Sequence, residues 1–216
     1  METSASQARS PALRSGIRLE VVTVIWMMIE GAIAIGSGVS AGSVLLVAFG
    51  LDSAIELFSG IALLWRFSAE TTSRTVEQIK RVERRATVLS AILLALLCLY
   101  VIITTVVGLV WRIKPESSFT GILVSTGALF VMPLLAHFKR GVNACLNSAA
   151  FRADIAESIT CAYMAATVLV GLALNAALGW WWAEYAAAAI FLYWLAGETR
   201  EAFKAANGNA DETQGN

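Results

Sequence analysis

Long apolar blocks alternate with short polar stretches along the chain. The apolar blocks cover residues 17–37, 41–65, 86–111, 119–138, 153–179 and 180–197. Apolar stretches of ~18 residues or more are long enough to cross a bilayer as a helix. Lipid offers no partner to open backbone groups, and the alternating pattern of a membrane barrel is absent, so each block is predicted to be helical. The pattern predicts an all-α integral membrane protein with a six-transmembrane-helix bundle.

Composition supports this class and excludes others. Hydrophobic residues make up 57% of the 216-residue chain and charged residues 15%, whereas soluble domains are about 45–50% apolar and about 25% charged. Basic and acidic residues balance at 16 each, so no net charge attracts nucleic acid. No HExxH or GxSxG motif indicates an enzyme. The predicted organisation is a polar N-terminal segment (1–16), a transmembrane domain (17–197) and a short polar cytoplasmic tail (198–216).

The basic residues predict the orientation of the bundle. Lys and Arg concentrate on the cytoplasmic side of membrane proteins. With a cytoplasmic N-terminus, only Arg112 and Lys114 fall in outer loops, and the other fourteen of the 16 basic residues fall in inner segments. Both termini are therefore predicted to be cytoplasmic, in a multi-pass protein of the cell membrane.

Acidic residues inside the apolar blocks are the candidates for chemistry. A charge at mid-membrane costs about 2.5–3.5 kcal/mol on insertion scales, so such residues persist mainly where they have a partner or a task. Asp52 and Glu56 lie four residues apart and therefore project from one face of a helix. Like charges repel strongly in a low dielectric, so a cation must lie between these two carboxylates or protons must neutralise them.

The block at residues 153–179 carries a second polar stripe. Asp154, Glu157, Ser158 and Cys161 follow at i, i+3, i+4 and i+7. With a rise of ~1.5 Å per residue, Glu56 lies about 15 Å from the inner end of its block and Cys161 about 13–14 Å from the inner end of its own. Packing of the two helices would bring four candidate ligands to one depth, where they could form a tetrahedral metal site. These ligands are Asp52, Glu56, Glu157 and Cys161.

An alternative is that these acids are protonated and serve as hydrogen-bonding links between helices. Glu30 fits a structural pairing and a lining role equally well. His137 lies at the inner end of its block and is read as an interfacial residue, and Cys98 lies among leucines and is read as a packing residue.

Two motifs resemble those of the cation diffusion facilitator family, six-helix metal/proton antiporters. They are GLDSAIE at residues 50–56 and RADIAESITC at residues 152–161. In that family the second and fifth helices each carry two ligands four residues apart. The resemblance places the metal ligands at Asp52, Glu56, Glu157 and Cys161, and it leaves Glu30, Asp154 and Ser158 as candidates for a proton relay or for hydrogen-bonding support. The chain departs from the family in lacking a His-rich loop and room for the C-terminal cytoplasmic domain.

The resemblance implies a divalent cation transporter that works by proton antiport and effluxes its ion. The thiolate of Cys161 would favour zinc or a similar ion over Mg²⁺ and Ca²⁺. Metal ions, protons and the bilayer are the expected partners, with a homodimer as an option and no prosthetic group or nucleic acid. Two other readings stay open: a membrane metal-binding or interaction protein without transport activity, and a proton-coupled carrier of a small organic cation.

Overall fold

The architecture is an all-helical bundle in the described part of the chain. The computed structural model describes the backbone of residues 2–71 and 76–214, and the side chains within them except 2–10, 69–71, 76–83, 86, 149 and 206–214. These residues form six helices and no strand. They are α1 (Glu2–Ala41), α2 (Val44–Thr71), α3 (Val76–Val110), α4 (Phe119–Leu146), α5 (Ala149–Leu178) and α6 (Trp181–Gln214). The predicted all-α class is confirmed.

Within the described residues, five helices contain stretches long and apolar enough to cross a membrane. The stretches are Pro11–Ala41, Val44–Ser68, Thr87–Val110, Phe119–Leu146 and Ala150–Leu178. Helix α6 is not among them. Its apolar part starts with tryptophans and Glu184 and gives way to polar residues after Gly197. The chain is thus a multi-pass membrane protein by helix length and composition, and a sixth span in α6 stays a prediction.

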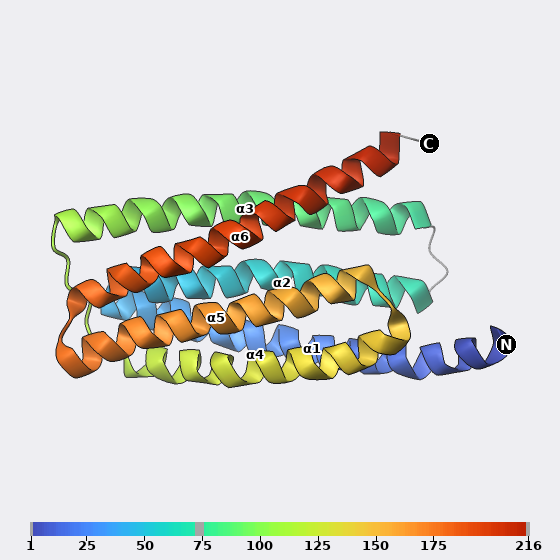
Figure 1. Ribbon diagram of the computed structural model, residues 1–216, viewed down its shortest axis with the longest axis horizontal. Coiled ribbons are helices and arrows are strands. Elements are labelled where there is room, and N and C mark those ends of the chain that lie inside the picture. The colour runs from blue at the N-terminus through green and yellow to red at the C-terminus, as the bar shows by residue number, and fades with distance from the viewer. Residues whose placement is uncertain (1, 72–75, 215–216) are drawn as a thin grey trace.

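The helices run side by side along one axis (Figure 1). Helix α1 packs against α2 and α4, α5 packs against α4 and α6, and α3 packs against α2 and α6. Helix α2 also contacts α5 and α6, which places it at the centre of the bundle. Both chain ends lie at the same end of the bundle as the α2–α3 and α4–α5 connections (Figure 1). The cytoplasmic location of this end stays a prediction.

The helices continue beyond the apolar blocks. Helix α1 begins within the predicted polar segment 1–16, α3 begins at Val76 in a charged stretch, and α6 continues through the predicted tail to Gln214. Polar residues can prolong a helix in water because its backbone hydrogen bonds are internal. Residues 72–75, part of the connection predicted between the second and third spans, lie outside the described residues.

Local signals fix several helix ends. Ser118 caps α4 by accepting a hydrogen bond from the Gly121 amide, and Ser148 caps α5 through the Phe151 amide. Gly179 ends α5 at φ 65°, a left-handed conformation that glycine adopts without steric cost. The chain can therefore reverse at once into α6.

Glycines also let α1 and α2 approach closely. A Cβ atom on Gly50 would lie 2.8 Å from the backbone nitrogen of Ile35, and one on Gly38 would lie 2.7 Å from that of Val47. Such contacts are too short for any side chain, so these positions require glycine. Small residues allow this kind of backbone contact between membrane helices, and here it sets the position of α2 relative to α1.

Candidate cation site

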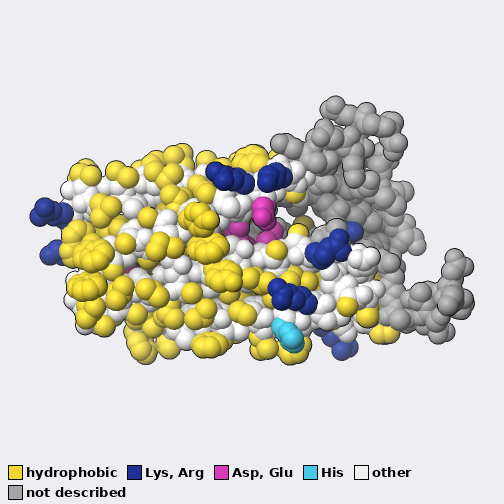
Figure 2. Space-filling model, viewed as in Figure 1, with side chains coloured by type: hydrophobic (Ala, Val, Ile, Leu, Met, Phe, Trp, Pro, Cys, Tyr) yellow, Lys and Arg dark blue, Asp and Glu magenta, His cyan; other side chains and the backbone are white. Residues whose placement is uncertain are grey.

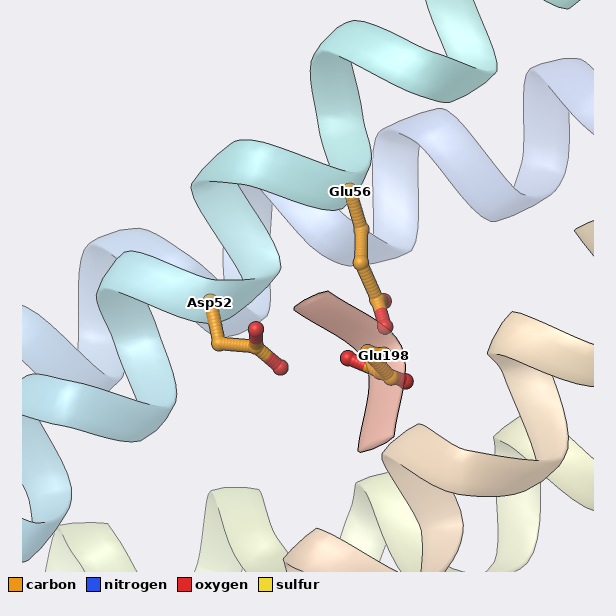
Figure 3. A group of neighbouring side chains, drawn as sticks. All are labelled: Asp52, Glu56 and Glu198. Atoms are coloured by element: carbon orange, nitrogen blue, oxygen red, sulfur yellow. The ribbon is translucent and has the colours of Figure 1, made fainter. Parts of the chain in front are cut away.

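Three carboxylates meet at the centre of the bundle. Asp52 and Glu56 come from successive turns of α2, and Glu198 comes from α6 (Figure 3). One ligand atom from each lies within 4.8 Å of those of the other two. Asp52 is fully buried and Glu56 is 5% exposed. We call these three residues the carboxylate trio.

Asp52 and Glu56 lack the partners that buried carboxylates normally have. The carboxylate oxygens of Asp52 and Glu56 have no hydrogen-bond partner among the described residues, and the same is true of Oε1 of Glu198. Buried polar groups are almost always hydrogen-bonded, and carboxylates this close repel one another strongly in a low dielectric. The arrangement therefore needs a cation or protons between the carboxyl groups.

A cavity of about 440 Å³ leads to the trio. It lies between α2, α3, α5 and α6, and acidic side chains line it together with small and polar ones. Figure 2 shows acidic side chains in a hollow of the surface with Lys and Arg side chains around it. The lining includes Arg66, Thr87 and Ala150, near the α2–α3 and α4–α5 connections. The cavity therefore approaches the trio from the end of the bundle that holds both termini.

Beyond the trio the bundle is closed by apolar packing. Asp52 lies one turn deeper than Glu56 and does not line the cavity. Further along the same direction, side chains of α2, α5 and α6 are fully buried against one another; among them are Ala48, Phe49, Met164, Val168 and Phe191. Glu56 and Glu198 consequently lie at the floor of a cavity that is accessible from one side, and Asp52 lies one turn behind them.

The sequence-predicted ligands are divided between two places. Asp52 and Glu56 lie in the trio, and Glu157 lines the same cavity. Cys161 is fully buried, and its Sγ atom lies 3.8 Å from Oε1 of Glu30 rather than within the trio's group of ligand atoms. The four-residue ligand set of the sequence analysis stays a prediction.

Glu30 has a complete set of donors. Its Oε1 accepts a hydrogen bond from Ser53 Oγ at 2.7 Å, and its Oε2 accepts one from Trp26 Nε1 at 2.5 Å. With the Cys161 thiol beside it, this carboxyl joins α1, α2 and α5. These contacts favour the structural reading of Glu30.

Asp154 belongs to a buried ion-pair cluster. Lys139 Nζ lies 2.7 Å from Asp154 Oδ2 and 2.9 Å from Glu20 Oε2. Lys139 and Glu20 are fully buried and Asp154 is nearly so. We call these residues the lysine triad; it links α1, α4 and α5. The nearby Ser158 hydroxyl donates to the Asp154 backbone carbonyl at 3.0 Å, within the same helix.

Sequence reasoning missed Glu198, Glu20 and Lys139 as members of these clusters. The predicted bounds put Glu198 in the tail and Lys139 in the inner connection after the fourth span, because both follow an apolar block. Helical periodicity was the available signal: Lys139 continues the buried stripe of Met132, Leu135 and Ala136, and Glu198 lies one turn after buried Leu195.

Comparison with known proteins adds no relative to this picture. No protein-family model matches the chain, and no curated protein matches it.

Proposed function

We propose that the chain is a divalent cation transporter that exchanges its ion for protons, in the manner of the cation diffusion facilitator family. One observation carries the proposal. Asp52 and Glu56 lie buried and without hydrogen-bond partners among the described residues, and half-buried Glu198 converges on them beside a cavity in a multi-pass membrane bundle.

The chemistry of exchange follows from electrostatics. A divalent cation stabilises ionised carboxylates, and without it protons must neutralise most of the charge. The binding of metal and the binding of protons at the site are therefore mutually exclusive. That exclusion is the elementary requirement of antiport.

One-sided access supports transport. The cavity reaches the trio from one end, and apolar packing closes the other. A carrier needs a second arrangement in which these two ends exchange roles, usually by rigid-body movement of helix groups about a central site. If the basic end is cytoplasmic, the described arrangement loads its ion from the cytoplasm, as an exporter does.

The motifs add support from the sequence. GLDSAIE carries two of the trio residues, and RADIAESITC carries Glu157, which lines the same cavity. Helices α2 and α5 contact each other, as the two ligand-bearing helices of the family do.

A second candidate is a proton-coupled carrier of a small organic cation. The cavity volume of about 440 Å³ favours it, since small-molecule sites occupy about 300–1,000 Å³ and a bare ion needs far less space.

Flux into proteoliposomes tests the proposal. The full chain is reconstituted with a metal-sensitive dye inside, and Mn²⁺, Co²⁺ or Zn²⁺ is added outside under an imposed pH gradient. We expect gradient-dependent uptake of at least one ion by the parent, and its loss in Asp52→Asn. Glu116→Gln, which changes an exposed acid near the start of α4, is the matched control and should transport like the parent.

The outcomes separate the candidates. Folded parent protein that binds a divalent ion without flux would contradict transport and favour the non-transporting metal-binding protein. Proton-coupled uptake of an organic monocation such as tetraethylammonium, with no metal flux, would favour the second candidate.

A further inference from the structure

We infer that the cation site is built from oxygen ligands alone, with Glu198 of α6 as its third carboxylate, and that it selects a hard divalent cation of the Mn²⁺ class. The inference rests on the proposed cation binding and names the class of ion. It also assigns a ligand to α6, where the family motifs place none.

The first step is the position of Glu198. Its carboxylate faces Asp52 and Glu56 from the opposite helix (Figure 3), with ligand atoms of all three residues within 4.8 Å of one another. Oxygen ligands lie about 2.0–2.6 Å from a divalent metal ion, so two ligands of the same ion are at most about twice that distance apart. The three residues can therefore bind one ion without a large movement of the helices.

The second step is the absence of partners around these carboxylates. Asp52 and Glu56 are at least nine-tenths buried, and none of their four oxygens is hydrogen-bonded within the described residues. Both side chains point toward Glu198 (Figure 3). A purely structural carboxylate would be expected to have donors, as Glu30 has from Ser53 and Trp26.

The third step is the position of sulfur. Cys161 directs its Sγ toward Oε1 of Glu30, at 3.8 Å, and it is not one of the three residues whose ligand atoms converge. A site of carboxylates and water suits Mg²⁺ and Mn²⁺, whereas thiolates favour softer ions. The cavity above the trio has room for waters that would complete an octahedral shell.

Binding to the purified full chain tests the inference. Free Mn²⁺ is measured by electron paramagnetic resonance during titration, with Cd²⁺ as the soft competitor. Glu198→Gln should weaken Mn²⁺ binding at least about tenfold. Glu201→Gln is the matched control, because Glu201 lines the same cavity one turn later on α6 but lies outside the trio; it should change Mn²⁺ affinity by no more than about twofold.

Cys161→Ser supplies the second arm. The ratio of Cd²⁺ to Mn²⁺ affinity should stay within about twofold of that of the parent. Bound Co²⁺ should show no sulfur-to-cobalt charge-transfer absorption in the near ultraviolet. A charge-transfer band that Cys161→Ser abolishes, or Mn²⁺ binding that Glu198→Gln leaves unchanged, would overturn the inference.

The results also distinguish this inference from the proposed function. Binding as expected with no flux in proteoliposomes would retain the oxygen-only site and reject transport. Flux of Zn²⁺ and Cd²⁺ that depends on Cys161 would retain transport and reject the oxygen-only site. Folded protein that binds no divalent ion would overturn both.

Discussion

Two clusters of acids that border the same cavity differ in the partners that the chain gives them. In the lysine triad, Lys139 lies within 2.9 Å of both Glu20 and Asp154. In the carboxylate trio, three acids converge, and no Lys or Arg with a described side chain forms an ion pair with them. The chain thus supplies a permanent cation to one cluster. The other cluster has no such cation among the described side chains, as the proposed exchange of a metal ion for protons requires.

The largest expected effect is the loss of stability when Lys139, the permanent cation of the lysine triad, is removed. Lys139→Met leaves two carboxylates buried without a counter-charge, and breaking such a pair typically costs about 3–5 kcal/mol. We expect a large fall in the melting temperature of the detergent-solubilised protein, followed by tryptophan fluorescence. Arg140→Met, an exposed neighbour on α4, should shift the stability by no more than about 0.5 kcal/mol.

Replacing the whole triad sharpens the same test. The triple variant Lys139→Met, Glu20→Gln and Asp154→Asn should recover much of the lost stability, because no unpaired charge is left. Equal stability of Lys139→Met and the parent would show that the triad is not a counter-charge device.

A smaller effect is expected where neutral donors satisfy a buried acid. Glu184 is 2% exposed and accepts hydrogen bonds from Ser43 at 2.5 Å and Asn175 at 2.7 Å. Glu184→Ala leaves those donors unsatisfied, which costs about 1–3 kcal/mol. The melting temperature should fall, whereas Mn²⁺ affinity should not change. Glu116→Ala changes an exposed acid in the α3–α4 connection and should leave both unchanged.

In the trio, removal of a carboxylate is expected to raise the stability of the metal-free protein, not to lower it. Glu56→Gln removes one of three mutually repelling carboxylates, so the metal-free protein should gain on the order of 1 kcal/mol in stability, less than the unscreened Coulomb energy of the pair. The same variant should lose the rise in melting temperature that a bound ion gives the parent. Destabilisation of the metal-free variant would indicate that Glu56 has a structural partner after all.

The smallest effect on stability is expected from a test of orientation. Lys114→Cys and Arg140→Cys are exposed substitutions, made in a chain whose own exposed Cys145 is replaced by serine. An impermeant thiol reagent added to intact cells should label position 114 and spare position 140. Labelling of position 140 alone would reverse the predicted topology, and the cavity would then face outward.

The sequence could predict the helices and two of the three trio residues, because apolar length and the spacing of Asp52 and Glu56 are properties of one helix. The rest depends on how helices are rotated against one another. The distance along each helix from its inner end predicts that Cys161 lies at the same depth in the membrane as the acids of α2. That distance does not determine the face of α5 on which the thiol lies. The thiol faces Glu30 instead.

Glu198 illustrates the second limit. The end of the last apolar block predicts the end of the transmembrane domain at residue 197, but α6 continues as a helix to Gln214. A carboxylate just beyond the last apolar residue can still face the bundle centre. The buried stripe along α6, and not its hydropathy, held that information.

The glycine contact between α1 and α2 has a consequence for mutational tolerance. A methyl group at Gly50 would meet the backbone of Ile35 at 2.8 Å, so even alanine would push the two helices apart or turn one about its axis. Turning α2 would separate Ser53 from Glu30, which now bond at 2.7 Å, and would swing the neighbouring Asp52 with it. If the trio binds an ion as proposed, the least tolerant positions for binding include Gly50, a residue without a ligand atom on the side of α2 that packs against α1.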